Sequence, residues 1–129
     1  MTETSHLSRG QQGEEIACYF LQKKGYKILE RNFTNTEGVR QGEIDIIALY
    51  KGKIIFVEVK TRKQSSQDEI LLPEVSITPA KLRKMLKISE YYLRKTKRWK
   101  QEYRYDAVTG CLNEESGKAK VRHLESIFF

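Results

Sequence analysis

The sequence contains little cysteine and little proline, and it has no long apolar run. Its two cysteines, Cys18 and Cys111, are too few for a disulfide scaffold or for a four-ligand zinc site of their own. The longest apolar runs cover residues 46–50 and 54–57, far short of the roughly 20 residues of a membrane-spanning helix. The polar residues 1–15 lack the apolar core of a signal peptide. These shortages predict a soluble, cytoplasmic protein with no membrane partner.

The sequence does contain enough apolar material for one hydrophobic core. Its 129 residues fall within the usual size of a single domain. The hydrophobic fraction of 39% is too high for a wholly disordered chain. We therefore expect one domain over residues 1–129, in which residues 1–7 are disordered.

Positive charge is concentrated in one stretch of the chain. The net charge is +7, yet residues 79–104 alone carry a net charge of +8 and the remainder a net charge of −1. A basic stripe on one element suits a polyanion such as DNA, because contacts with phosphates release condensed counterions. The alternative is a solvated helix face that keeps the protein in solution. The residues that we expect to bind nucleic acid are Lys81, Arg83, Lys84, Lys87, Arg94, Lys95 and Arg98.

Hydrophobic spacing and turn residues predict the element order α-β-β-β-α-β-β. One helix begins at a capping box over residues 8–11 and has its C-terminal cap at Gly25, and a second begins at residues 78–79. The expected strands are residues 26–33, 43–50, 53–62, 102–108 and 119–127. Gly10 and Gly13 each cost the first helix about 1 kcal/mol relative to alanine, so we expect another segment to approach its backbone there.

Two neighbouring strands of this pattern carry charged residues at matched positions. A two-residue turn at residues 51–52 would place Asp45 directly opposite Glu58 and Glu43 opposite Lys60, with all four side chains on one face. Two carboxylates opposite each other destabilise a sheet, and partial burial increases that cost. A divalent cation between Asp45 and Glu58 would remove the conflict, and oxygen ligands favour Mg²⁺ or Mn²⁺.

Lys60 extends this group toward catalysis. A lysine beside the acids could orient or deprotonate a water molecule and stabilise charge that develops on a phosphate. The alternative is purely structural: Glu58 and Lys60 would face solvent at the end of a strand, and Asp45 would bond to a nearby backbone amide. Catalysis is our preferred interpretation, because the acids, the lysine and the segregated basic stretch occur together.

The motifs resemble those of a known family. Residues 42–48 and 56–62 resemble the YraN family of small bacterial proteins, which is similar to a branch of the PD-(D/E)xK nuclease superfamily close to the archaeal Holliday-junction resolvases. Residues 13–17 and 25–32 resemble the opening of that family, and residues 104–106 its late strand. The resemblance implies an α/β fold with a restriction-endonuclease-like αβββαβ core, in which helices flank a mixed central sheet.

The resemblance also implies roles for individual residues. Asp45 and Glu58 stand at the metal-binding acids of the superfamily, and Lys60 stands at its lysine. Glu14 matches an acid of the first helix that serves as an extra metal ligand, and Glu43 belongs to the YraN pattern as an auxiliary residue. The implied activity is Mg²⁺- or Mn²⁺-dependent endonucleolytic hydrolysis of DNA, including branched DNA. A homodimer is a further expectation, because dimers are common among junction resolvases.

Other interpretations stay open at this point. The superfamily includes members that bind without cleaving, so a catalytically inactive nucleic-acid-binding module is the main alternative. A third interpretation is a protein-interaction domain whose basic helix meets an acidic partner. Trp99 could stack on a base or seal the end of the second helix against the sheet. We expect Asp106 to pair structurally, and we assign no catalytic role to His123.

Overall fold

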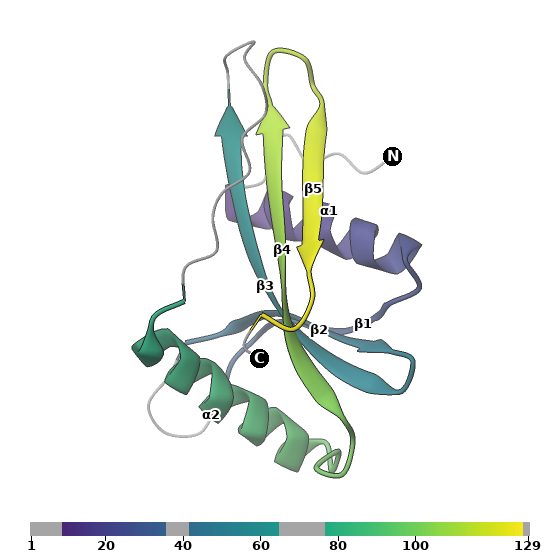
Figure 1. Ribbon diagram of the computed structural model, residues 1–129, viewed down its shortest axis with the longest axis vertical. Coiled ribbons are helices and arrows are strands. Elements are labelled where there is room, and N and C mark those ends of the chain that lie inside the picture. Colours follow the sequence, from purple (N-terminus) through teal and green to yellow (C-terminus); the bar gives the residue numbers. More distant parts are fainter. Residues whose placement is uncertain (1–8, 36–41, 65–76, 128–129) are drawn as a thin grey trace.

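A computed structural model describes residues 9–35, 42–64 and 77–127, as a mixed α/β structure with a five-stranded sheet (Figure 1). The elements are α1 (Arg9–Lys23), β1 (Lys27–Phe33), β2 (Ile44–Tyr50), β3 (Lys53–Gln64), α2 (Pro79–Lys95), β4 (Tyr103–Asn113) and β5 (Ala119–Leu124). This order confirms the predicted one. The expectations for residues 1–7 and for Ser8 as the first helical cap lie outside the described residues.

The sheet has the order β1-β2-β3-β4-β5, and only one of its strand pairs is parallel. Strands β1 to β3 form an antiparallel meander, β3 runs parallel to β4, and β4 runs antiparallel to β5. Helix α2 lies in the connection between β3 and β4, as parallel pairing requires a long crossover. This arrangement is consistent with the expected restriction-endonuclease-like core.

The hairpin of β2 and β3 has the predicted register. Lys51 and Gly52 form a two-residue turn with φ values of +49° and +79°, and Tyr50 pairs with Lys53. Positive φ at both turn positions matches the right-handed twist of the strands. The register then continues without interruption to Ile46 paired with Val57.

The sheet separates two hydrophobic clusters. On one face α1 packs Ala17 and Leu21 against buried side chains of β2 and β3, including Ile55. On the other face α2 packs Ile88 against a cluster that contains Phe56. The two strands of the hairpin are thus covered on both faces, which agrees with apolar side chains on both faces of each strand.

The helices end as the sequence predicted. Thr78 caps α2, its hydroxyl accepting a hydrogen bond of 3.1 Å from the backbone N–H of Lys81. After α1, Gly25 adopts a φ of +97°, which a side chain would disfavour. The backbone N–H of Tyr26 then donates to the carbonyl of Leu21 at 3.0 Å, and the chain turns into β1.

The close approach expected at the first helix occurs at Gly13. A Cβ atom at that position would lie 2.4 Å from Cγ2 of Thr61 on β3. Real Cβ atoms do not approach other atoms so closely, so the absence of a side chain at Gly13 allows α1 to lie against the sheet. The close packing of α1 on β3 thereby offsets the loss of helix stability that Gly13 causes relative to alanine.

Three strand ends differ from the prediction, and the first is that of β3, which continues to Gln64 rather than ending at Arg62. Strand β4 continues to Asn113, five residues beyond the predicted end, because it pairs in parallel with β3 as far as Gln64. Strand β5 ends at Leu124 rather than at residue 127. In the described part of the chain, no helix is long and apolar enough to cross a membrane.

Candidate functional site

The candidate site begins where β2 leaves β3. The pairing of these strands stops after Ile46 and Val57, while β2 remains paired with β1 as far as Ile44. Asp45 is therefore not backbone-paired with Glu58, and its Oδ2 accepts a hydrogen bond of 2.8 Å from the backbone N–H of Val59. The structural alternative for Asp45, a bond to a nearby amide, is thus present in the fold.

This separation also changes the face of Ile44. Regular alternation would place its side chain on the same face as that of Ile46, but it packs in the cluster under α2 instead. The side chains of β2 cease to alternate regularly at Asp45. The regular part of the hairpin thus ends one position short of the acids.

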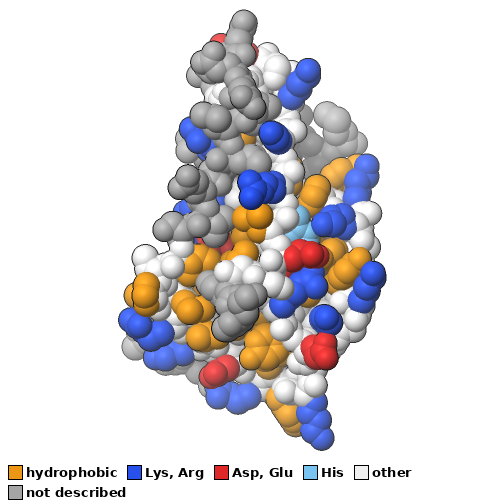
Figure 2. Space-filling view, in the orientation of Figure 1, with side chains coloured by type: hydrophobic (Ala, Val, Ile, Leu, Met, Phe, Trp, Pro, Cys, Tyr) orange, Lys and Arg blue, Asp and Glu red, His pale blue; other side chains and the backbone are white. Residues whose placement is uncertain are grey.

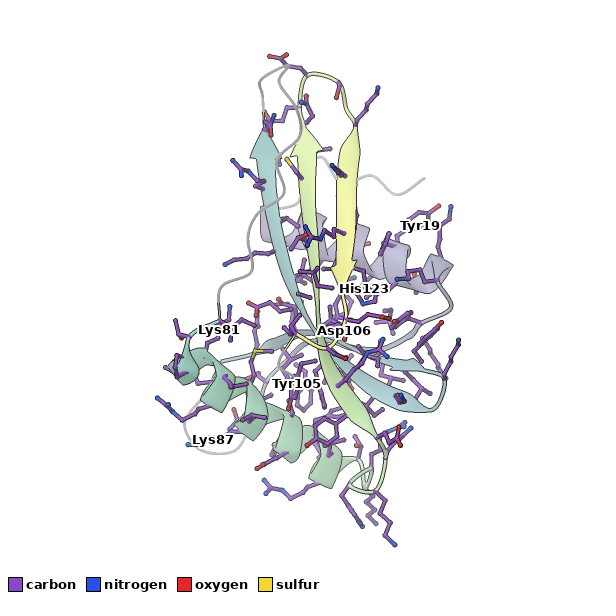
Figure 3. All side chains as sticks on the ribbon, in the orientation of Figure 1. Tyr19, Lys81, Lys87, Tyr105, Asp106 and His123 are labelled. Atoms are coloured by element: carbon purple, nitrogen blue, oxygen red, sulfur yellow. The ribbon has the colours of Figure 1, made fainter. Side chains whose placement is uncertain are left out.

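A recess of about 200 Å³ opens at this point. It is lined by Glu43, Ile44, Asp45, Val57, Glu58, Lys81 and Met85. Strands β2 and β3 supply the acids, and α2 supplies Lys81, which Figure 3 shows between the start of that helix and the sheet. The recess is therefore a junction of three elements distant in sequence.

Asp45 is the most perturbed acid of the recess. Burial raises its pKa to about 6, although the hydrogen bond from Val59 acts in the opposite direction. The negative charges of Glu14, Glu58 and Glu43 raise the pKa further. Asp45 is thus an acid held beside other acids with too little solvent to separate their charges.

Three of these acids converge closely enough to share a cation. Ligand oxygens of Glu14, Glu43 and Asp45 all lie within 4.8 Å of one another. Carboxylate oxygens are ligands that Mg²⁺ and Mn²⁺ prefer, so these three side chains would be the ones to hold such an ion. The family resemblance implied that Glu14 lies with Asp45 and Glu58, and the structure brings Glu14 and Asp45 together with Glu43 instead.

Glu58 instead forms an ion pair with Lys81. Its Oε1 accepts from the Lys81 ammonium, and its side chain is only 11% exposed. Its other oxygen, Oε2, is buried and has no hydrogen-bond partner among the described residues. Glu58 therefore lies at the edge of the acidic group with one oxygen still to be satisfied.

Lys81 does not occupy the position that the basic-stripe interpretation assigned to it, whereas Lys60 lies on the strand where the sequence placed it. Lys81 faces the recess rather than the outer surface of α2, so it is a site residue. Lys60 is exposed, two residues beyond Glu58 on β3. Regular alternation places Lys60 on the same face of the strand as Glu58.

The outer surface of α2 has the basic character that the sequence predicted. Arg83, Lys84, Lys87, Arg94 and Lys95 are all exposed on α2, whereas Arg98, just beyond it, is partly buried. Figure 2 shows Lys and Arg side chains along the lower left edge, over α2. Figure 3 shows Lys87 on the outer side of the helix.

Two of these basic residues make specific contacts. The Lys95 ammonium lies 6.0 Å from the ring centre of Phe33, and Arg98 donates to the side chain of Gln101 at 3.1 Å. Trp99 is 58% exposed, so the alternative that it seals the helix end is wrong. Stacking of Trp99 on a base stays a prediction.

A second charged cluster, on the α1 face, was only partly expected. Asp106 is fully buried and accepts hydrogen bonds from Arg104, from His123 and from the backbone N–H of Ser126. Burial alone would raise the pKa of Asp106, but these hydrogen bonds hold it below its usual value. Lys24 can only donate to Nδ1 of His123, so Nε2 carries the proton that points to Asp106.

This cluster confirms the structural role expected for Asp106. Its oxygens are occupied by three donors, which leaves it no free position toward a cation. The alternation of Arg104 and Asp106 along β4 is the sequence signal for it. The partnership with His123 had no such signal, because β5 is a separate segment.

Fold and recess together define a small mixed α/β protein with a restriction-endonuclease-like core and an acidic recess where β2 and β3 separate. The chain belongs to the uncharacterised protein family UPF0102, whose model matches residues 13–109. It is 40% identical over 116 residues to a UPF0102 protein of Syntrophomonas wolfei, over 90% of this chain and 93% of that protein. It is 39% identical over 129 residues to the UPF0102 protein TTE1452 of Caldanaerobacter subterraneus, over 99% and 100% of the two chains. UPF0102 is the YraN family that the motifs resemble, so the predicted family is confirmed. Membership in the nuclease superfamily stays a prediction.

Proposed function

We propose that this protein is a Mg²⁺- or Mn²⁺-dependent endonuclease that hydrolyses DNA phosphodiester bonds. The observation that carries the proposal is the convergence of Glu14 with Glu43 and Asp45, the last two of which line the recess. A buried oxygen of Glu58, without a hydrogen-bond partner among the described residues, lies in the same recess. Hard oxygen ligands of this kind suit Mg²⁺ or Mn²⁺.

Different residues in and around the recess would bind the cation and the substrate. Glu14, Glu43 and Asp45 would hold the ion, with Glu58 at its edge. A bound ion would neutralise phosphate charge and lower the pKa of a coordinated water. Lys60 would donate to a phosphate oxygen or orient the water from the exposed side of β3.

The outer surface of α2 supplies the binding energy in this proposal. Arg83, Lys87 and Arg94 are exposed on it, and contacts from such residues fix the position of a duplex without reading its sequence. The rise in the pKa of Asp45 supports a site that exchanges a proton for a cation. Branched DNA as the preferred substrate and a homodimer as the active species belong to the proposal as well.

Metal binding and cleavage test the proposal together. Wild-type protein should bind Mn²⁺ in calorimetry and cut duplex, flap or four-way-junction DNA, whereas Asp45→Asn should lose both. Glu30→Gln on β1 removes an exposed carboxylate outside the acidic group and serves as the matched control. Lys60→Met should keep metal binding and lose cleavage by about 100-fold or more. Wild-type protein that neither binds the metal nor cuts any of these substrates would refute an endonuclease.

A second candidate function, DNA binding without cleavage, is favoured by one contact. The ion pair of Lys81 with Glu58 neutralises one acid of the recess without any metal. Such a module would bind DNA in a salt-sensitive manner, and Asp45→Ala and Lys60→Ala would leave that binding unchanged. Metal-dependent cutting that both substitutions abolish would exclude this candidate.

A further inference from the structure

A basic surface other than that of α2 lies on the sheet itself. Strands β3 and β5 each contain the pattern Lys-x-Arg, at Lys60 and Arg62 and again at Lys120 and Arg122. Because side chains alternate along a strand, the two cations of each pattern lie on one face. The sequence interval with the excess charge, residues 79–104, contains none of them.

The register places the four cations on the same face of the sheet. Thr109 of β4 pairs with Lys60 on one side and with Arg122 on the other. Cys111 pairs in the same way with Arg62 and Lys120. The cations thus form two rows about 10 Å wide and about 7 Å apart, and we call this group the sheet-face cations.

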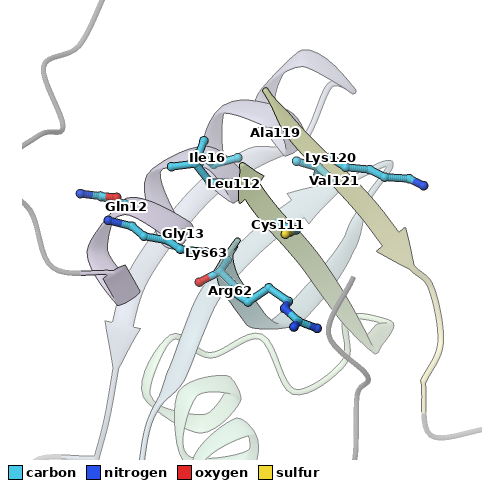
Figure 4. A pocket seen from close by; sticks show the side chains of 12 residues that line it. Gln12, Gly13, Ile16, Arg62, Lys63, Cys111, Leu112, Ala119, Lys120 and Val121 are labelled. Atoms are coloured by element: carbon cyan, nitrogen blue, oxygen red, sulfur yellow. The ribbon is translucent and has the colours of Figure 1, made fainter. Parts of the chain in front are cut away.

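The sheet-face cations point away from α1. Figure 4 shows Lys63 directed toward that helix and Arg62 directed away from it. Figure 2 shows Lys and Arg side chains over the upper part of the molecule, where β4 and β5 run in Figure 1. All four residues are exposed, whereas Thr109 and Cys111 between them are buried.

Several cations of the fold have a carboxylate partner, whereas these four side chains have none among the described residues. Arg31, Lys81 and Arg104 each form an ion pair with a carboxylate. Among the residues that the structure describes, no carboxylate pairs with any sheet-face cation. Along this face of β3, β4 and β5 the one acid is Glu58, which Lys81 already neutralises. Within the part of the chain that the structure describes, the four charges are therefore not neutralised.

The position of this surface fits a partner that also reaches the recess. Lys60 lies closest to the recess along β3, two residues from Glu58, which lines the recess, and it forms one corner of the sheet-face cations. The basic surface of α2 begins on the other side, beyond Lys81. The acidic recess thus lies between two groups of cations.

We propose that the sheet-face cations bind the phosphodiester backbone of DNA, so that the nucleic acid contacts the protein on both sides of the recess. This inference rests on the proposed function, because it assumes DNA as the partner. A protein partner would need an apolar or aromatic anchor at the centre of its interface. The centre here is Thr109 and Cys111, which are small and buried, so charge is what this face offers to a partner.

Salt-dependent binding to duplex DNA in EDTA tests the inference. The variant Arg62→Gln, Lys120→Gln, Arg122→Gln should weaken binding at 0.1 M salt at least about tenfold and reduce the slope of log K against log salt by about 2 to 3. The matched control is Lys23→Gln, Lys27→Gln, Lys51→Gln, which removes the same charge from exposed residues near the far end of the hairpin. The control should change the slope by less than about 1.

The design separates failure of the inference from failure of the proposed function. Equal slopes for the triple variant and its control, with wild type binding DNA, would overturn the inference alone and leave the cations as protection of the edge strand β5. Wild type that does not bind DNA at all would overturn both. The double variant Lys120→Gln, Arg122→Gln leaves β3 intact and should lower the slope by about 2, should the triple variant fold poorly.

Discussion

The carboxylate of Asp45 accepts a hydrogen bond of 2.8 Å from the backbone N–H of Val59. In a continued hairpin, this N–H would have donated to a backbone carbonyl of β2. The side chain thus ends the pairing of β2 with β3 and holds the two strands at the mouth of the recess. Burial and three nearby acids raise the pKa of this same carboxylate to about 6.

Asp45→Asn should stabilise the metal-free protein near pH 7.5, because the carboxylate is held there in its unfavourable charged form. The folded state keeps a proton on Asp45 up to about pH 6, whereas the unfolded chain releases it near pH 4. Stability of the wild type therefore falls as pH rises between these values, by about 3 kcal/mol. Urea unfolding in EDTA should show that Asn gains about this much at pH 7.5 and nothing at pH 3.5. An equal difference at both pH values would contradict the assignment.

Asp106→Asn should destabilise the protein by about 3 kcal/mol or more, because it removes the buried partner of Arg104. The pKa of Asp106 is lowered, so its contribution is present above about pH 4 and is lost as the pH falls through the folded-state value. Acid unfolding should therefore begin at higher pH in this variant. The control Glu125→Gln removes an exposed partner of the same arginine and should cost less than about 1 kcal/mol.

Lys81→Met should leave Glu58 buried without a cation and lower the free energy of unfolding by about 1 kcal/mol, since Lys81 is itself partly exposed. The variant should also bind Mn²⁺ about threefold more tightly or better, because a competing positive charge is gone. The control Lys84→Met changes an exposed lysine three residues further along α2. It should change neither the free energy of unfolding nor the affinity for Mn²⁺. Weaker metal binding in Lys81→Met would show that the lysine does not compete for the acids.

Gly13→Ala should destabilise the fold by about 2 kcal/mol, although alanine favours a helix by about 1 kcal/mol. The new methyl group would meet Thr61 on β3, and a β-branched side chain has little freedom to move aside. A double-mutant cycle with Thr61→Ala checks the cause, since part of the loss should be recovered in the double variant. Additive losses would place the strain elsewhere.

Local rules predicted most of the fold. The turn at Lys51 and Gly52 determined the hairpin register, and the caps at Thr78 and Gly25 determined where helices begin and end. The second half of β4 was not predicted, because Gly110 and the polar residues near it are not typical of a strand. This half of the strand is stabilised by its pairing with β3. Parallel pairing leaves no nearby turn in the sequence to reveal it.

The sequence predicted which acids lie near one another better than it predicted how they are arranged. Asp45 and Glu58 share a recess, but uniform pairing of the hairpin predicted a direct contact that a side-chain hydrogen bond replaces. The inward position of Lys81 did have a signal: it precedes Met85 by four residues and Ile88 by seven, the spacing of one helix face. Its membership in a basic stretch obscured that spacing.

The single parallel pair of the sheet has a consequence for how the protein assembles. Strands β1 to β3 are joined by short connections and can associate early, whereas Ile54 meets Tyr103 only after 49 residues of chain have been closed into a loop. During folding, the acids of β2 and β3 therefore come together before α2 packs on the sheet and brings Lys81 close to them. We expect refolding to be rate-limited by closure of this crossover, and divalent cations to accelerate it by screening the acids in the early meander.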